Sequence, residues 1–461
     1  MEENYLIFEQ LPPAKLLLKC AVPAAFSMIF SGLYSIADGI FVGHCIGSDA
    51  LAAVNLVMPL IAIAFSLAEL IATGSSVQLA NLLGQKEYDR ANRTFSVCIK
   101  VIVGMSFLIG LVFFFLCKLM LTVMGAGGYA LQYSIEYIRV YAVFAPLIIV
   151  FFAVDNYLRI CGKQNYSMIL NIVTAVLNII LDFLLIVVLR QGIWAAAFAS
   201  CISISLGILV AFYPFIRNKL SLKFVAGSIP FKQFVQLAAN GASEFFGSIA
   251  GSVFSFILNI VLLSIGGATA VAAMSVVMYV ESLVASMLFG MVDSVQPAIS
   301  YCKGAGLHKR VWALEKWVLA AAAVLSITVC LILRYCGAFV VPFFVKPGET
   351  ELLTLSIHAM RLYALSYLVN WIDGCLSGFL TALGQAGRSF TVSIMGTLVL
   401  PLVGLAILVP SMRLDGVCLM PLLSGVANAV LAIALVITMR KNCKNIKNVE
   451  TDNEKHHGRG C

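Results

Sequence analysis

The chain has 461 residues, of which 61% are hydrophobic and 11% charged, and its mean hydropathy is +1.00. A soluble domain of this length cannot bury so much apolar surface, so the composition excludes a soluble globular protein and indicates an integral membrane protein. The net charge of +8 reflects membrane topology and predicts no nucleic acid partner. The 13 cysteines are scattered singly and predict neither a disulfide framework nor a structural metal site.

Twelve apolar runs are each long enough to cross the hydrocarbon core as a helix, which takes about 20 residues. Their approximate limits are 16–41, 51–80, 94–123, 133–157, 166–189, 192–216, 234–264, 270–300, 311–341, 352–380, 390–410 and 415–439. The preceding segment, MEENYLIFEQLPPAK, is acidic and broken by prolines, unlike a secretory signal, so the first run is expected to remain as a helix. The predicted fold class is therefore all-α integral membrane, with twelve transmembrane helices and no soluble domain between them.

A weak internal repeat relates the two halves of the chain. The matched positions are Gly162 and Ser167 with Gly384 and Ser389 (offset 222), Gly192 with Gly416 (offset 224), and Gly47 with Gly266 (offset 219). Each repeat holds six crossings, an even number, so both halves enter the membrane from the same face and form a parallel pseudo-two-fold repeat. We expect two six-helix lobes around a central cleft, with alternating access by rocking one lobe against the other.

The predicted domains are an amino-terminal lobe at 1–216, a basic linker at 217–233, a carboxy-terminal lobe at 234–440 and a basic tail at 441–461. Lys and Arg accumulate on the cytoplasmic side because they resist translocation. Of the 30 Lys and Arg residues, 23 fall on the side that holds both termini, and 7 fall on the other side. Both termini are therefore predicted to be cytoplasmic.

Acidic residues recur inside the apolar runs. Asp38 lies near the end of the first run, and Asp182 lies within the fifth. An acid at the centre of a bilayer costs roughly 2.5–3.5 kcal/mol on insertion scales, so repeated acids favour ion movement or binding of cationic ligands. The other acids of this kind are Glu69, Glu244, Glu281, Asp293 and Asp373. Asp155, four residues before Arg159, is expected to make a local salt bridge.

The sequence resembles the multidrug and toxic compound extrusion (MATE) transporters, which share a superfamily with flippases for polysaccharides and lipid-linked precursors. The resemblance covers the whole chain, and its specific part runs from Arg159 through Asp182 to the glycine and alanines at 192–197. Its carriers are Pro23 with IADGIFVGHCIGSDALAAVNLVMP at 36–59, LRICGKQNYSMILNIVTAVLNIILDFLLIVV at 158–188 with GIWAAAFAS at 192–200, and QPAISYCKGAG at 296–306. It implies a cation-coupled exporter of amphipathic, often cationic, organic compounds, driven by inward proton or sodium flow.

Carried over by position, the resemblance implies an amino-lobe cation site at Asp38, Asn178, Asp182 and Ser200, and a helix bend at Pro23, which lacks a backbone donor. Independently, Asn178 and Asp182 are four residues apart and share a helix face. Two nearby carboxylates in a low dielectric do not both ionise cheaply, so the set suits a shared proton or a sodium ion. Ser200 replaces the more usual threonine and leaves the choice of ion open. No catalytic residue and no cofactor are expected.

In the carboxy-terminal half, Glu244 and Asp373 lie where related subfamilies keep a second acidic site. Glu281 and Asp293 are further candidates for a substrate cavity there, and neither they nor Glu69 match a family position. All the singled-out polar residues, in both halves, have a structural alternative, since membrane helices are often held together by interhelical hydrogen bonds. For the second-lobe acids, facing the cavity and packing between helices remain equally open.

Three classes of function remain. A secondary exporter is favoured by the paired lobes and the buried acids. A flippase for a lipid-linked saccharide would need cationic residues along the cleft, whereas Arg139, Arg334 and Arg361 are few and lie toward the outer half. A membrane enzyme would need a His, Ser or metal constellation, and the five histidines form none. We expect a monomeric antiporter in a bacterial plasma membrane, surrounded by lipid, with a small amphipathic molecule as its substrate.

Overall fold

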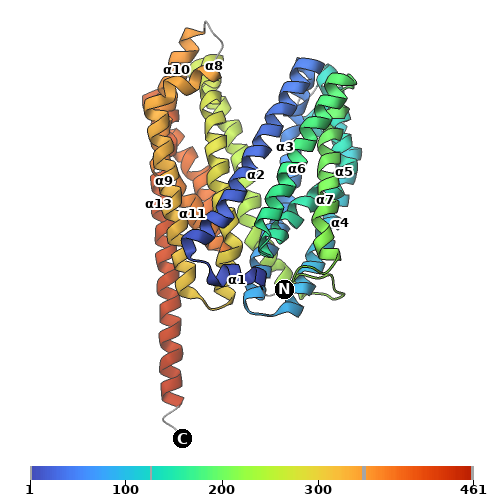
Figure 1. Cartoon of the computed structure of the whole chain (residues 1–461). Helices are drawn as coiled ribbons and strands as arrows, with labels where there is room; N and C mark the ends of the chain where they lie inside the picture. The colour runs from blue at the N-terminus through green and yellow to red at the C-terminus, as the bar shows by residue number, and fades with distance from the viewer. Residues whose placement is uncertain (1–2, 125–126, 345–348, 458–461) are drawn as a thin grey trace.

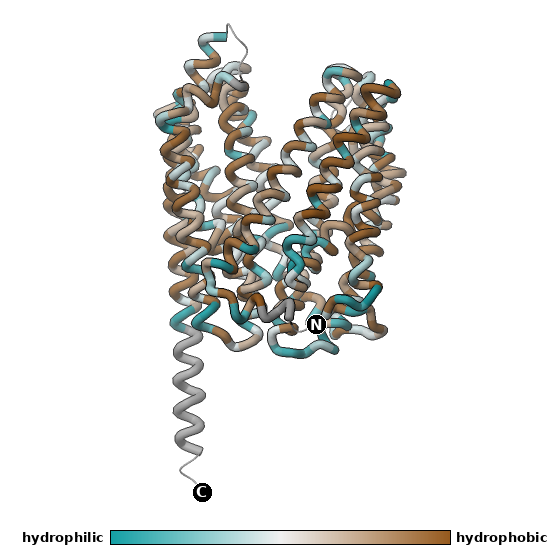
Figure 2. The backbone as a smooth tube through the Cα atoms, viewed as in Figure 1, coloured by the Kyte–Doolittle hydropathy of each residue, from teal (hydrophilic) through white to brown (hydrophobic). Residues whose placement is uncertain are grey.

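The computed structural model of the chain describes residues 3–124, 127–344 and 349–457. Within these ranges every regular element is a helix and no strand occurs, which confirms the predicted all-α class. Helices are the expected solution in hydrocarbon because each backbone N–H and C=O is paired within its own segment. Hydrophobic residues dominate the middle of the bundle, and hydrophilic residues gather toward one end of it (Figure 2).

The amino-terminal half begins with a short helix, α1, and continues through six long ones. Their bounds are α1 Glu3–Gln10, α2 Pro13–Phe41, η1 Val42–Ile46, α3 Ser48–Gly84, α4 Tyr88–Val123, α5 Gly128–Ile160, α6 Gln164–Asp182, η2 Phe183–Val188 and α7 Trp194–Ile216. The elements η1 and η2 are π-helical turns that extend α2 and α6. Helix α1 was not predicted, because its segment MEENYLIFEQLPPAK is too short to cross a membrane.

The carboxy-terminal half contains two very long helices and several short ones. Their bounds are α8 Phe231–Gly304, α9 His308–Val340, η3 Val341–Phe343, α10 Thr350–Tyr363, η4 Ala364–Leu368, α11 Asn370–Ala382, α12 Ala386–Ile394, η5 Met395–Val399 and α13 Leu400–His457. The backbone of α8 leaves the helical region at Gly267, with φ 62°, and that of α13 leaves it at Arg413, with φ 49°. Each of these two elements is therefore a pair of helices.

Twelve membrane crossings follow from these elements. Nine helices among the described residues are long and apolar enough to cross a membrane. Two of the nine, α8 and the span made by α12 to α13, are broken at Gly267 and Arg413 and supply two crossings each. The remaining crossing is a bent pair, Thr350–Leu368 with Asn370–Ala382, at an angle of 43°. The predicted number of helices is confirmed.

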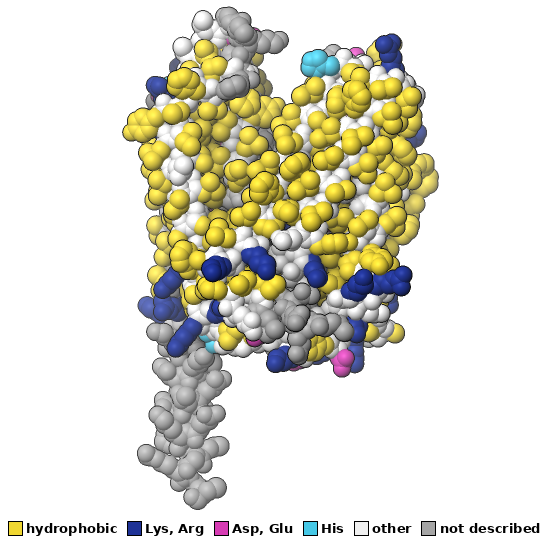
Figure 3. Space-filling view, in the orientation of Figure 1, with side chains coloured by type: hydrophobic (Ala, Val, Ile, Leu, Met, Phe, Trp, Pro, Cys, Tyr) yellow, Lys and Arg dark blue, Asp and Glu magenta, His cyan; other side chains and the backbone are white. Residues whose placement is uncertain are grey.

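The helices form two groups that make a V (Figure 1). The amino-terminal group, blue to green, and the carboxy-terminal group, yellow to red, approach each other at the end that carries the N terminus and separate at the opposite end. We call these the closed end and the open end. Figure 3 shows the surface hollowed between the two groups at the open end. The chain therefore adopts the predicted two-lobe architecture.

The hydrophobic core is divided in the same way. One cluster of buried side chains lies entirely in the amino half, between Val42 and Ala197. A second lies entirely in the carboxy half, between Leu258 and Met420. The third cluster draws on both halves and uses the helix ends near the closed end, such as Leu83 and Tyr301. Each lobe thus has its own core, and a shared core holds the lobes together at one end.

Glycines allow α3 and α8 to cross at backbone distance where the lobes meet. A Cβ atom at Gly84 would overlap the carbonyl oxygen of Tyr301, and one at Gly304 would overlap that of Asn81. Deeper in the membrane, Gly74 and Gly241 make the same kind of contact between these two helices. Small residues at membrane helix crossings permit close packing. We call this set of four glycines the glycine seam.

Candidate functional site

Four polar residues lie buried in the amino lobe: Asp38 on α2, Asn178 and Asp182 on α6, and Ser200 on α7. These are the residues that the sequence predicted for a cation site. Asp38 lies one turn before η1, and Asp182 is the last residue of α6 before η2. Single π-helical turns are frequent at functional sites, because they place an extra residue in the helix and reorient its neighbours.

Hydrogen bonds join three of these four residues. The Asn178 side-chain amide lies 3.0 Å from the Ser200 hydroxyl. When the amide oxygen faces Ser200, it accepts from the Ser200 hydroxyl at 3.0 Å and from the Ser200 backbone N–H at 3.2 Å, and the amide nitrogen donates to Asp182 Oδ2 at 3.3 Å. This orientation pairs every group, so Asn178 links α7 to the Asp182 carboxylate.

The two carboxylates are close enough for their charges to interact. Among the described side chains, Oδ1 of Asp38 and Oδ1 of Asp182 are buried without a hydrogen-bond partner. A buried polar atom without a partner is costly, and a bound cation or proton would remove that cost. No three His, Cys, Asp or Glu of the described residues surround one metal position. A cation here would therefore also use the amide and hydroxyl oxygens of Asn178 and Ser200.

Three tyrosines lie near Asp38, and no sequence pattern predicted them. Tyr34, Tyr137 and Tyr141 are close enough to Asp38 for electrostatic interaction with its carboxylate. Tyr137 and Tyr141 are stacked with ring centroids 5.3 Å apart, and the Tyr137 side chain is fully buried. The spacing of residues in the sequence could not predict this group, because the tyrosines lie on two different helices, α2 and α5.

Pro23 lies inside α2 and is buried. Its carbonyl oxygen accepts a hydrogen bond from the Ser27 hydroxyl at 3.0 Å. The helix is continuous from Pro13 to Phe41, so the proline is accommodated without a break. A functional bend at this position stays a prediction.

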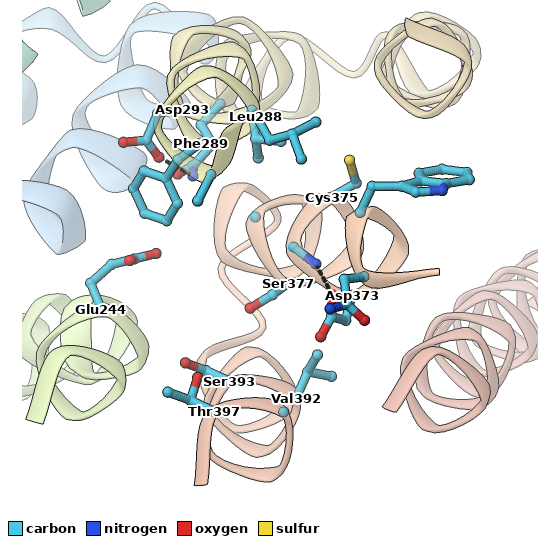
Figure 4. A pocket seen from close by; sticks show the side chains of 18 of the residues that line it. Glu244, Leu288, Phe289, Asp293, Asp373, Cys375, Ser377, Val392, Ser393 and Thr397 are labelled. Carbon is cyan, nitrogen blue, oxygen red and sulfur yellow. Dashed lines mark hydrogen bonds between the residues drawn. The ribbon is translucent and has the colours of Figure 1, made fainter. Parts of the chain in front are cut away.

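The four second-lobe acids that the sequence singled out line one cavity of about 250 Å³ in the carboxy lobe. Figure 4 shows Glu244 and Asp293 on the two crossings of α8, with Asp373 on α11 opposite them. Glu281 lies on the second crossing of α8. The bend before α11 brings Trp371 and Asp373 into the cavity wall. The cavity is therefore built around a broken helix, an arrangement that transporters use for binding sites.

The partners of these acids differ. Asp373 accepts hydrogen bonds from the Asn428 amide at 2.7 Å and from the Gly374 backbone N–H at 2.8 Å. The Tyr367 hydroxyl donates a hydrogen bond to Glu281 at 2.5 Å, and the Gln296 amide donates one to Asp293 at 2.8 Å. Glu244 has no hydrogen bond or ion pair with any described side chain. It is consequently the carboxylate most available to a ligand.

A second cavity of about 280 Å³ lies between the lobes and is lined by both of them. The carboxy lobe contributes Glu244, Phe289 and Asp293, so the two acids face both cavities. The amino lobe contributes Glu69, one of the acids that matched no family position, from α3. Glu69 lies within electrostatic reach of the other two carboxylates. Three acids without an ion-pair partner among the described residues therefore lie together where the lobes face each other. The position of Glu69 could not be predicted, because the sequence does not show which face of α3 meets the other lobe.

The cationic side chain of this cavity is already neutralised. Arg159 is the one Lys or Arg among the described lining residues, and it forms the expected salt bridge with Asp155 at 2.7 Å. Ser167 donates to Asp155 at 2.5 Å, and Asn171 donates to it at 3.1 Å. The described lining of the cavity between the lobes therefore holds more carboxyl groups than cationic side chains.

Comparison with known families identifies one match. The MatE family model matches residues 23–184 and 245–407. The matched parts fall one in each half of the chain and contain Asp38, Asp182 and Asp373.

Curated relatives and solved structures cover nearly the whole chain. The multidrug export protein MepA of Staphylococcus haemolyticus is 25% identical over 445 residues, which cover 95% of this chain and 96% of the relative. MepA of Staphylococcus saprophyticus is 26% identical over 409 residues, covering 87% and 88%. An outward-facing multidrug resistance MATE transporter structure has a TM-score of 0.87 at 22% identity, covering 97% of this chain and 99% of that one. A MATE structure in complex with MaL6 has a TM-score of 0.89, also at 22% identity, covering 97% and 100%.

Proposed function

Because the chain belongs to the multidrug and toxic compound extrusion family of efflux transporters, we propose that it exports amphipathic, cationic organic compounds in exchange for protons or sodium ions. The observation that carries this proposal is the cavity between the lobes. It combines three carboxylates, Glu69, Glu244 and Asp293, with a cation, Arg159, that is paired with Asp155. A positively charged ligand held there would give these buried carboxylates a partner.

The apolar part of the substrate fits the rest of the lining. Phe152 and Phe289 contribute rings to the cavity between the lobes, and Trp371 contributes one to the carboxy-lobe cavity. Aromatic faces attract organic cations, and they also bury apolar groups. An amphipathic cation would satisfy the carboxylates with its charge and the rings with its body.

Coupling is assigned to the amino-lobe site of Asp38, Asn178, Asp182 and Ser200. The proposal is supported by the two buried carboxylate oxygens without partners and by the amide and hydroxyl beside them. Proton binding would neutralise one of the carboxylates. Sodium would be held by the oxygens of all four residues, with the Asn178 amide turned so that its nitrogen donates to Ser200 and its oxygen is free. Either ion would change the charge of the interface between α2 and α6, and so the packing of the two helices.

The proposed orientation places the closed end in the cytoplasm of a bacterial cell. Lys and Arg side chains gather at the closed end in Figure 3, as the positive-inside rule requires. In that orientation the V opens outward, and the transport cycle would rock the lobes, 1–216 and 234–440, about the linker 217–233. The open cavity would then release substrate outside and admit the coupling ion.

A flippase for a lipid-linked saccharide is the alternative within the same superfamily. It would need free cationic side chains for a pyrophosphate group. The described lining of the two cavities holds one cation, Arg159, and that cation is paired. The charge of the cavities therefore favours export of a cation over flipping of an anionic lipid.

Accumulation of a fluorescent organic cation in bacterial cells that lack their own efflux pumps tests the proposed substrate class. Cells that produce the protein should hold less of the cation than cells that produce the Glu244→Gln variant. A neutral dye of similar size should distinguish the two strains much less. Equal accumulation of the cation in cells with and without the protein would contradict the proposal.

A further inference from the structure

The short helix α1, Glu3–Gln10, lies at the closed end and is held there by the carboxy lobe. Arg310, at the start of α9, donates from Nε to the Phe8 carbonyl at 2.6 Å and from a second guanidinium nitrogen to the Leu11 carbonyl. The Tyr301 hydroxyl donates to Glu9 at 2.9 Å. Several polar contacts therefore fix a helix that is too short to be stable alone.

Apolar packing adds to these bonds. The Phe8 side chain is 1% exposed and belongs to the core that both lobes share. Its ring lies 5.6 Å from the Tyr301 ring, centroid to centroid, and the Cys302 thiol lies 3.6 Å from the Phe8 carbonyl. Movement of α1 and Leu11 away from the carboxy lobe would thus expose the Phe8 side chain and leave the Arg310 guanidinium without its two carbonyl partners.

The chain then continues into α2, which packs on both lobes. Two residues, Leu11 and Pro12, separate α1 from α2, and Pro12 is extended with φ −53° and ψ 141°. The lower half of α2 passes beside Gly290 of α8. Its upper half packs on the amino lobe, where Phe41 contacts Phe183 with ring centroids 6.4 Å apart. A link of two residues reaches at most about 7 Å and proline stiffens it, so it cannot absorb a large separation.

Tyr301 stands at the centre of this arrangement. Its hydroxyl binds Glu9 of α1, and its backbone carbonyl touches Gly84 of α3 across the glycine seam. Opening the closed end requires the end of α8 to leave α3. Because α1 is anchored to the carboxy lobe and continues into α2, whose upper half is held by the amino lobe, that movement would strain the hydrogen bonds of Arg310 and Tyr301.

We propose that α1 is a strap that holds the two lobes together at the closed end, and that Arg310 is the positioning residue that anchors it. The closed end opens when the strap is released. Arg310→Ala or Phe8→Ala therefore raises the population in which the closed end is open. Loss of charge-assisted hydrogen bonds of this kind changes such an equilibrium by roughly tenfold or more.

Hydrogen–deuterium exchange of the purified full chain tests the strap, without substrate or ion gradient. We expect roughly tenfold faster exchange in Arg310→Ala at residues 79–90, on the amino-lobe side of the glycine seam, as well as at 299–310. Phe8→Ala should do the same, and Arg310→Lys should lie between wild type and Arg310→Ala. Arg334→Ala is the matched control, because Arg334 also donates to a backbone carbonyl, that of Arg361 at 3.1 Å, but toward the open end.

The amino-lobe segment decides the outcome. If exchange in the Arg310 and Phe8 variants accelerates at 3–12 and 299–310 but not at 79–90, α1 is a structural appendage of the carboxy lobe and the proposal is wrong. Unchanged exchange everywhere would also overturn it. The readout is independent of the proposed function, since transport can fail while the strap holds the lobes, and the reverse.

Discussion

The side chains of Asn178 and Ser200 are hydrogen-bonded at 3.0 Å and tie α6 to α7 one turn before Asp182. Asn178 has one amide, and its oxygen and nitrogen can serve Ser200 and Asp182 together. Ser200 therefore sets the orientation of the Asn178 amide, whose nitrogen donates a hydrogen bond to the Asp182 carboxylate. The proposed coupling site thus includes a hydroxyl group that is hydrogen-bonded to Asn178 and to neither carboxylate.

Replacing that hydroxyl should uncouple export at little cost in stability. Ser200→Ala removes the bond to Asn178, and interhelical hydrogen bonds in membranes are worth about 0.6 kcal/mol on average. We expect the melting temperature to fall by no more than a few degrees and gradient-driven export to fall several-fold. Ser200→Thr keeps the hydroxyl and should retain both. Full export by the alanine variant would mean that Asn178 needs no orienting partner.

Glu244 and Asp293 should discriminate between charged and neutral substrates. Glu244→Gln and Asp293→Asn remove a charge contact worth about 1.5–3 kcal/mol, which corresponds to roughly 10- to 100-fold in affinity for a cation. Binding of neutral compounds should change little. Equilibrium binding to purified protein measures both, with Asp49→Asn, an exposed acid at the start of α3, as the control. Equal losses for both kinds of ligand would assign these acids to ion coupling or folding.

The Arg159–Asp155 pair should be needed for the fold as a pair. Both side chains are largely buried, with 12% and 9% of their surface exposed. Arg159→Met leaves Asp155 uncompensated and should cost about 3–5 kcal/mol, as removal of one partner of a buried pair does. The double variant Arg159→Met with Asp155→Leu should recover much of that loss. Thermal denaturation in detergent compares the three proteins, and additive losses in the double variant would refute the pairing argument.

Orientation is tested by reporters that are active only in the cytoplasm. Fused after Cys461, such a reporter should be active. Inserted beside Asp49, between the first and second crossings, it should be silent. An odd number of membrane crossings lies between Asp49 and Cys461, so the two positions are on opposite sides of the membrane. The reverse pattern would place the closed end, with its band of Lys and Arg, outside the cell.

The sequence predicted the membrane crossings well and the contacts between them poorly. Apolar runs of about 20 residues are a direct consequence of bilayer thickness, so all twelve crossings were found. The break at residues 364–369 carries no Pro or Gly signal, and so the run 352–380 was predicted as one helix. The structure divides it into α10, η4 and α11. Side-chain packing between helices, which has no local pattern, decides where that helix bends.

The candidate sites show the same division. Asp38 and Asp182 were found because an acid in an apolar run is conspicuous and because the surrounding residues resemble a family. Glu69 was conspicuous as well, but no pattern told which helix face meets the other lobe. The tyrosines around Asp38 and the docking of α1 through Arg310 depend on long-range contacts. These features could be recognised only once the helices were placed together.

Transport into proteoliposomes tests the central claim most directly. Purified protein is reconstituted, and movement of a fluorescent organic cation is followed under an imposed pH gradient and, separately, under an imposed sodium gradient. We expect the organic cation to move in exchange for at least one of the two ions. The transport rate should fall at least tenfold in Asp38→Asn and in Asp182→Asn, while both variants remain folded and inserted. Wild-type protein that responds to neither gradient, or variants that transport at the wild-type rate, would contradict this claim.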